Sequence, residues 1–353
     1  RGGRVSKHVR CSQGSAHRDA AVTSLCDNNL LTYAPPSSMQ ERLDLGSDSP
    51  RPGPIPCDTS ADGVAAQPRG EEMVDTQEGE RMLHVFAGPP RLGSPEEAAA
   101  GVQGHVDAVD LLRGGWRHDV GQAALRAALL DAVKAKRYTS VWIGTPCSSF
   151  TLWRTVSTMR SIRARTQPEG LDGLPQREQD YLALHNDLVE FSAELALAAF
   201  EAGCTVVIEN PADRGMVGSV LFKWAARHHV PLWLMPVMIR LQHRMGAKLV
   251  TFPQCCFGPF QKWTSLMVAG PRAHEFLVLH GIPCTHEKHD RVARGRDPQG
   301  RSNAAESAAY PLGLVALLVW ILLRPEAWRV PGQLPQLQFF SREALQPLAQ
   351  AIE

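Results

Sequence analysis

The sequence predicts an α/β fold in which helices cover both faces of a sheet. Between residues 83 and 268, short apolar runs alternate with segments of helical periodicity. The clearest run, 141–143, breaks at Gly144-Thr145-Pro146 and is followed by Cys147, and a later run, 206–208, leads into Glu209-Asn210-Pro211. Ligands of open α/β sheets bind outside the carboxyl ends of the strands. We therefore expect Cys147 and Glu209 at one rim of the sheet.

The elements of the first half are predicted one by one. Residues 83–91 form a strand that turns at Gly88, and the Ser94-Pro95-Glu96-Glu97 run starts a helix with Ser94 as its N-cap. Residues 105–111 form a second strand with Asp110 at its end, where a carboxylate can accept hydrogen bonds from a ribose. Residues 122–136 have a helical period and end in basic side chains.

The second half predicts a long helix and the remaining strands. Residues 182–202 are an amphipathic helix that ends at Gly203. Residues 230–234 and 247–252 are strand candidates, and 263–268 return as a strand, so 252–268 predict an antiparallel hairpin at the sheet edge. Residues 308–323 are strongly apolar but shorter than a bilayer span, and carry Pro311 in the first turn. They predict a buried terminal helix.

Composition predicts three regions along the 353 residues. Residues 1–80 show no sustained period of either 2 or 3.6 and predict a disordered, low-complexity segment, followed by one α/β domain over 81–325 and a tail over 326–353. Because the first residue is Arg, we expect the chain to be a fragment of a longer protein.

Charge and cysteine usage narrow the classes of protein. A net charge of +1 excludes a protein that is basic over its whole surface, as a histone-like nucleic-acid binder is. The same net charge is compatible with a local basic patch. The eight cysteines follow no regular framework spacing, which indicates free thiols in a reducing compartment. Without a predicted membrane span or signal peptide, we expect an intracellular protein without membrane contact.

Two polar features could carry chemistry beside Cys147. The thiol itself is a candidate nucleophile, although a free cysteine is most often a small buried apolar residue. The loop that follows is basic and could hold phosphates, or it could be a solvated mobile loop. Its basic residues are Arg154, Arg160, Arg163 and Arg165.

The Cys284-Thr285-His286-Glu287-Lys288-His289 run is the obvious metal candidate. It holds a thiol and two imidazoles within six residues, which is suggestive but incomplete for zinc. Cys255 and Cys256 add ligands only if the fold brings them near. The alternatives are an ordinary loop that binds no metal, a structural zinc site, or a metal-stabilised hydrolase or nuclease that uses Cys284, His286 and His289.

The order of motifs resembles the C5-cytosine DNA methyltransferases. It is more closely similar to the divergent methyltransferase-like domains of algal and protist transposable elements, over about residues 82–323. The motifs that carry the resemblance are Phe86-Ala87-Gly88, Asp110, His118-Asp119-Val120, Thr145-Pro146-Cys147, Glu209-Asn210-Pro211 and the 254–264 hairpin with its Gln-Cys-Cys-Phe-Gly and Lys-Trp-Thr runs.

The resemblance implies a Rossmann-like sheet that binds S-adenosylmethionine and methylates cytosine C5 in nucleic acid, DNA in the first place, in the nucleus. Cys147 would attack C6 of the base, Glu209 would bond N3 and the exocyclic amine, and Lys262 would stand where the family uses an arginine. Gln254, together with Lys262, would contact the nucleic acid in place of the family's Gln-x-Arg-x-Arg pattern. The residues implied to bind the cofactor are Phe86, Gly88, Asp110, Asp119 and Pro146.

The chemistry supports these residue types independently. C5 of cytosine is a poor nucleophile, so a thiolate that adds at C6 creates the enamine character that can take a methyl group. The base must be flipped out of a duplex or supplied single-stranded. The chain also departs from the family: the cofactor turn continues as Pro89-Pro90, Ser148 replaces a glutamine, and 269–307 leaves little room for a recognition domain. These departures keep open a catalytically decayed binding module from a transposable element.

Overall fold

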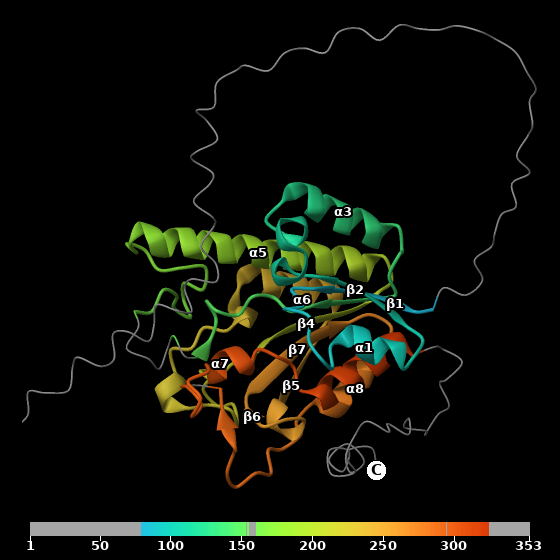
Figure 1. Cartoon of the computed structure of the whole chain (residues 1–353). Coiled ribbons are helices and arrows are strands. Elements are labelled where there is room, and N and C mark those ends of the chain that lie inside the picture. Colours follow the sequence, from blue (N-terminus) through green and yellow to red (C-terminus); the bar gives the residue numbers. More distant parts are fainter. Residues whose placement is uncertain (1–78, 153, 155–159, 294, 325–353) are drawn as a thin grey trace, which may run out of the picture. The chain divides into compact units, whose positions relative to one another are not determined.

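A mixed six-stranded sheet organises the α/β domain. The computed structural model describes residues 79–152, 154, 160–293 and 295–324, so the expectations for the N-terminal segment and the C-terminal tail fall almost wholly outside it (Figure 1). The strand order is β2-β1-β3-β4-β7-β5. The strands of this sheet are β1 (Arg81–Val85), β2 (His105–Val109), β3 (Ser140–Ile143), β4 (Thr205–Pro211), β5 (Lys248–Pro253) and β7 (Trp263–Ala269).

One strand of the sheet, β7, runs opposite to the other five. β2, β1, β3 and β4 run parallel, whereas β7 is antiparallel to both β4 and β5. The predicted hairpin is therefore confirmed, with β5 at the edge and the returning strand β7 inserted beside β4. A separate pair of short parallel strands, β6 (Phe260–Gln261) and β8 (Arg291–Val292), lies outside this sheet.

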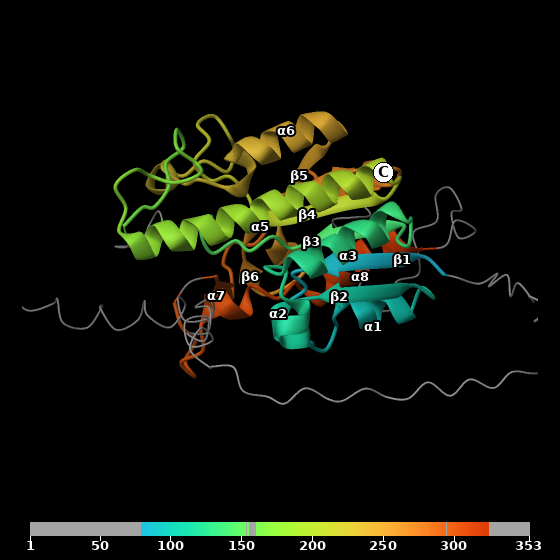
Figure 2. The ribbon, with the colours of Figure 1, turned by 90° about the horizontal axis from the view of Figure 1, so that it is seen from above.

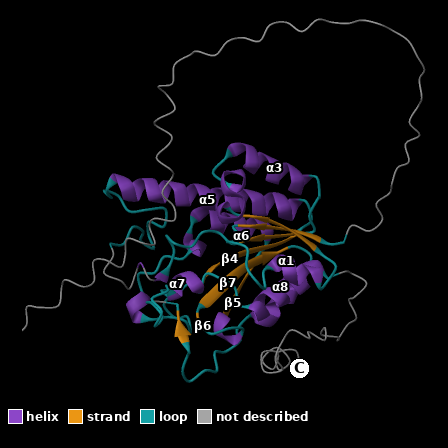
Figure 3. Ribbon diagram, viewed as in Figure 1, coloured by secondary structure: helices purple, strands orange, loops and turns teal. Residues whose placement is uncertain are grey.

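Helices connect the strands (Figure 3). Most of the element boundaries predicted from the sequence agree with the structure within a few residues. The α-helices are α1 (Pro95–Ala100), α2 (Leu111–Gly114), α3 (Ala123–Lys134), α5 (Gln176–Glu201), α6 (Pro236–Met245), α7 (Asn303–Glu306) and α8 (Leu312–Leu323). The 3₁₀ segments are η4 (Gly115–His118), η5 (Trp224–Ala226), η6 (Leu232–Leu234), η7 (Gln254–Cys256) and η8 (Ala273–Leu279).

Alternation along the strands divides the core into two layers. Leu83 and Val85 of β1 pack into a cluster with α3, α5 and α6, and α5 lies over β3 and β4. Met82 of the same strand and Trp142 of β3 point to the other face, which α1, η8 and α8 cover. Figures 1 and 2 show α1 and α8 on this side of the sheet, opposite α3 and α5. Helices on both faces confirm the predicted α/β class.

The terminal helix α8 is buried, as predicted. Its residues are apolar all round, which suits a helix packed between the sheet and α1. Pro311 is the N-cap of α8 and not a residue of its first turn. No helix within the described ranges is both long and apolar enough to cross a bilayer.

One predicted strand is wrong, whereas the predicted start of α1 at Ser94 is confirmed. Residues 230–234 are not a strand: Leu232–Leu234 form the 3₁₀ segment η6, closed by hydrogen bonds from Leu234 N to Pro231 O and from Met235 N to Leu232 O. The run is buried against α6, so its apolar character reflects burial and not strand pairing. Ser94 is the N-cap of α1, but its side chain makes no cap bond; the carboxylate of Glu97 instead accepts from Gly93 N at 2.8 Å.

Candidate active site at the carboxyl rim of the sheet

The strand order reverses between β1 and β3, because the chain runs from β1 to β2 on one side and later places β3 on the other. The crevice outside the carboxyl ends of strands at such a switch point is the usual ligand site of an open α/β sheet. The Phe86–Gly88 turn follows β1 here, and the Gly144–Cys147 turn follows β3. The sequence-predicted residues of both turns therefore lie at the same rim.

The turn after β1 has an unusual backbone. Phe86 has φ +59° and Gly88 has φ +71°, both in the left-handed region that non-glycine residues rarely adopt. The conformation is held by the Phe86 N–H, which donates to Val109 O at 2.9 Å, and by the Gly88 N–H, which donates to Asp110 Oδ2 at 2.9 Å. A Cβ on Gly88 would meet no atom within 4 Å, so the space above this turn is open.

Asp110 joins the turns that follow β1 and β2. Besides Gly88, its carboxylate accepts from Leu112 N at 2.8 Å and so caps α2. Arg113, which sequence reasoning missed, donates from Nε to Gly88 O at 2.7 Å and pairs with Glu96 of α1. Phe86, Gly88 and Asp110 are thus brought together, as predicted. Asp119 lies at the end of η4, where Oδ1 accepts from Gly121 N at 2.8 Å.

Glu209 is a buried carboxylate with donors on both oxygens. Lys262 Nζ lies 3.5 Å from Oε1, and the Thr264 hydroxyl donates to the same oxygen at 3.4 Å. The Tyr310 hydroxyl donates to Oε2 at 3.1 Å. Burial first, and the Glu209 charge second, raise the pKa of Tyr310 well above its usual range, so this hydroxyl keeps its proton. A charged group at 6% exposure requires such partners.

The Cys147 thiol belongs to the same site. Asn210, next to Glu209, donates from Nδ2 to Thr145 O at 2.8 Å and ties the end of β4 to the turn that presents Cys147. The turn is closed by Phe150 N, which donates to Cys147 O at 2.8 Å. Burial raises the pKa of Cys147; the positive charge of Lys262 opposes this shift, and the negative charge of Glu209 adds to it.

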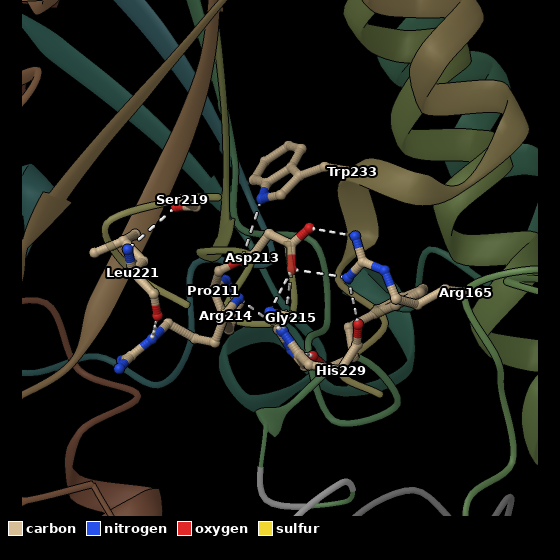
Figure 4. Close-up of polar contacts among 10 residues, drawn as sticks. Arg165, Pro211, Asp213, Arg214, Gly215, Ser219, Leu221, His229 and Trp233 are labelled. Atoms are coloured by element: carbon tan, nitrogen blue, oxygen red, sulfur yellow. Dashed lines mark hydrogen bonds and ion pairs between the residues drawn. The ribbon is translucent and has the colours of Figure 1, made fainter. Parts of the chain in front are cut away.

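The loops after β3 and β4 are locked together by the Asp213 network (Figure 4). Arg165, from the loop after β3, binds both carboxylate oxygens of Asp213 at 2.9 and 2.8 Å. Such bidentate pairs fix geometry as well as adding energy. Trp233 Nε1 donates to Pro211 O at 3.1 Å and anchors the end of β4 itself. The loops that follow the Cys147 turn and β4 are therefore tied to each other.

His229 in this network is neutral. Its Nε2 contacts the carbonyl oxygen of Phe150 at 2.9 Å, and its Nδ1 accepts from Arg214 N at 3.2 Å. The first contact requires a proton on Nε2 and the second requires a free lone pair on Nδ1, which together define one neutral tautomer. Burial, the largest cause, lowers the pKa of His229 and keeps it in that form.

The four arginines of the basic loop divide into two pairs. Arg163 is buried and donates to Ser149 Oγ at 3.1 Å and to Asn186 Oδ1 at 2.9 Å, while Arg165 serves Asp213. Arg154 donates to Ser148 O at 3.1 Å and lies over the Tyr181 ring, and Arg160 is exposed. Among the predicted phosphate-binding residues, Arg154 and Arg160 thus face the surface, whereas Arg163 and Arg165 hold the loop.

Gln254 is buried and supports the carboxylate indirectly. Its Nε2 donates to Thr264 Oγ1 at 2.7 Å, and its backbone N–H donates to Lys262 O at 2.7 Å. Gln254 and Lys262, which the sequence paired, therefore lie side by side, and Thr264 connects Gln254 to Glu209. The candidate metal ligands Cys284, His286 and His289 form a cluster with Cys255, the neighbour of Gln254.

Sequence reasoning missed Tyr310 as a site residue, although its segment was part of the resemblance. Tyr310 reaches Glu209 from the N-terminal side of α8 and packs on Trp142, which also stacks on His84. Only the long separation of Tyr310 from Glu209 in the sequence hid this contact. No protein-family model and no curated protein matches the chain.

Proposed function

We propose that the chain is an S-adenosylmethionine-dependent methyltransferase that acts on cytosine C5 in nucleic acid, DNA in the first place, through a covalent bond to Cys147. The observation that carries the proposal is the pairing of a thiol after β3 with a buried carboxylate at the end of β4. The Asn210–Thr145 hydrogen bond holds the two segments in register, and the charge of Lys262 reaches both groups.

Each group has a defined part in this chemistry. The Cys147 thiolate adds to C6, which moves the ring electrons toward C5 and N3. Glu209, aligned by Tyr310 and Thr264, stabilises the charge that develops at N3. Lys262 lowers the cost of forming the thiolate, because a nearby cation favours the ionised form. After transfer at C5, loss of the C5 proton and expulsion of the thiolate restore the aromatic base.

The β1 and β2 turns fit a nucleoside cofactor. The open space above Gly88 lets a ligand approach the backbone, and the Asp110 carboxylate lies at the end of β2, where ribose hydroxyls are bound in related nucleotide sites. S-adenosylmethionine, held by Phe86, Gly88, Asp110, Asp119 and Pro146, would supply the methyl group. The switch point between β1 and β3 supports a Rossmann-like methyltransferase sheet.

A binding module without turnover is the second candidate. The observation in its favour is that burial raises the pKa of Cys147 although Lys262 opposes the shift, which keeps the thiol protonated. Pro89-Pro90 in place of a second glycine also changes the cofactor turn.

Ser148 is a less suitable nucleophile than Cys147. Its partner His185 lies 3.1 Å away, but burial lowers the pKa of His185 to about 3, which makes this imidazole too weak a base at neutral pH.

Trapping tests the proposal. The full chain is incubated with S-adenosylmethionine and a DNA or RNA oligonucleotide that contains 5-fluorocytosine, whose fluorine cannot leave from C5 as the proton does. We expect a denaturation-resistant adduct by gel and mass spectrometry. The Cys147→Ala variant should form none, whereas Cys204→Ala, altered at the opposite end of β4, should form it as the wild type does.

Three outcomes would change the conclusion. An adduct that persists in Cys147→Ala rejects Cys147 as the nucleophile. No adduct, with cofactor binding still seen by calorimetry, supports the binding module. Absence of both adduct and cofactor binding rejects both candidates.

A further inference from the structure

We propose that Cys255, Cys284, His286 and His289 bind one structural zinc ion. The four side chains offer two sulfur and two nitrogen ligands, and these atoms all lie within 4.8 Å of one another. The site is separate from the Cys147–Glu209 chemistry, and it stands whether or not the chain is a methyltransferase.

The distances within the cluster are close to those of a metal centre. Cys284 Sγ lies 3.5 Å from Cys255 Sγ, 3.7 Å from His286 Nδ1 and 3.0 Å from His289 Nε2. Around a tetrahedral zinc with bonds of about 2.3 Å to sulfur and about 2.0 Å to nitrogen, neighbouring ligand atoms lie about 3.3–3.8 Å apart. A small closing movement of the histidine loop would therefore complete the coordination.

The ligands come from two segments that are distant in sequence. Cys255 belongs to η7 and is buried, directly after edge strand β5. The other three lie in the 284–290 loop between η8 and β8, most of which is exposed. Between Cys284 and Asp290, the loop has no buried apolar side chain to hold it. A metal ion would supply the attachment that a hydrophobic contact supplies elsewhere.

The ligand set selects the metal and the role. Two thiolates with two imidazoles are typical of zinc, because softer sulfur ligands disfavour magnesium and calcium. Four protein ligands complete the tetrahedron and leave no position for a reactive water, so the cluster suits a structural zinc and not a hydrolase centre. Binding releases the thiol proton from each cysteine.

The zinc would brace the segment that carries Lys262. Cys255 follows Gln254, which bonds Lys262 O and Thr264, and β8, which follows the histidine loop, pairs with β6 just before Lys262. Fixing both η7 and the β6–β8 pair would restrict the position of Lys262 relative to Glu209. The metal would act on the active site only through this support.

Metal analysis of the full chain tests the proposal. Protein without a histidine tag is equilibrated with zinc, desalted and measured by inductively coupled plasma mass spectrometry; we expect about one zinc per chain. Cys255→Ser and His289→Asn should each lower the zinc content about tenfold or more. The matched control is Cys256→Ser, since its thiol contacts Pro283 O and is not among the four ligands.

A spectroscopic measurement on the wild type keeps the test independent of variant folding. After chelation, titration with Co²⁺ should saturate at one equivalent, with thiolate-to-cobalt charge-transfer bands and the strong visible absorption of tetrahedral cobalt. Hydrogen exchange in 254–264 and 284–292 should be faster in the metal-free chain. A wild type that holds no zinc, a Cys255→Ser variant that keeps it, or a weak octahedral cobalt spectrum would each overturn the proposal.

Discussion

Glu209 shows at the scale of one residue how a charge is kept inside this fold. A buried carboxylate is stable only when its oxygens are paired, and Lys262, Thr264 and Tyr310 supply the donors. Only Lys262 carries a charge. The two hydroxyls therefore decide the orientation of the carboxylate, and Tyr310 is the sole one of the three that comes from the segment before α8.

Removing the Tyr310 hydroxyl should destabilise the fold through Glu209. Tyr310→Phe leaves the ring on Trp142 but takes the donor from Oε2, and we expect a loss of about 1–3 kcal/mol in the free energy of unfolding in urea. In a double-mutant cycle with Glu209→Gln, the coupling should be about 1 kcal/mol or more. Tyr181→Phe is the control, because its hydroxyl bonds the exposed Ser148 and its loss should cost much less. Equal losses in the two variants would contradict this role.

At the scale of elements, the turn from β7 into η8 depends on Gly270. This residue has φ +94°, and a Cβ on it would lie 2.3 Å from Cys204 O and 2.9 Å from Thr205 Cα, at the start of β4. Both atoms belong to the backbone, so a side chain cannot be accommodated by a rotamer change. The glycine is what allows β7 to leave the sheet so close to β4.

Gly270→Ala should therefore be strongly destabilising. Gly203 provides the matched control, because it has nearly the same φ, +92°, with no atom within 4 Å of its Cβ position. Gly203→Ala should cost only the left-handed backbone term, about 1–2 kcal/mol. Gly270→Ala should cost about 2 kcal/mol more, the price of shifting packed backbone. Chemical denaturation measures both; similar losses would show that β4 yields easily at this point.

The sequence predicted well the elements whose pattern is local. The runs that became β1, β3 and β4 are largely apolar because both faces are covered, and a glycine, proline or acid lies at or shortly after the end of each. Residues 230–234 show the same composition but form η6, since burial alone makes a short run apolar. Pairing of β7 between β4 and β5 is a long-range choice that periodicity does not encode.

The candidate site was predictable where it follows strand ends and hidden where it depends on distant contacts. Asp110 directly follows β2, Cys147 lies in the turn after β3, and Glu209 lies near the end of β4, so their rim position could be inferred. Tyr310 and Thr264 reach Glu209 only through tertiary packing. For the basic loop, the sequence predicted too many ligand-binding residues. A charge pattern does not reveal that Arg163 and Arg165 bond to partners within the protein.

At the scale of the whole molecule, buried neutral histidines link stability to pH. His84 on β1 and His185 on α5 are both buried, and burial is the main cause that lowers each pKa to about 3. Arg113 and Arg91 add to the effect at His84, as Arg163 and Arg154 do at His185. In the unfolded chain these imidazoles take up protons near pH 6.5.

The protein should accordingly lose stability as the pH falls below about 6.5. Below that pH the unfolded state binds protons at these two imidazoles, whereas the folded state leaves them unprotonated down to about pH 3. The contribution of the two histidines to stability is therefore complete above the unfolded pKa and is lost as the pH falls from about 6.5 toward about 3. Each histidine contributes about 1.4 kcal/mol per pH unit, or about 4 kcal/mol for the pair between pH 6.5 and pH 5. Urea unfolding at pH 7 and pH 5 measures the difference.

The His84→Phe variant separates this linkage from general acid damage. A phenyl ring can keep the stack on Trp142 and cannot titrate, so the variant should lose about 2 kcal/mol less than the wild type between pH 7 and pH 5. His274→Asn, altered at an exposed side chain, should follow the wild-type curve. An unchanged slope in His84→Phe would mean that His84 takes up its proton at the same pH in the folded and the unfolded chain, and would contradict the lowered pKa.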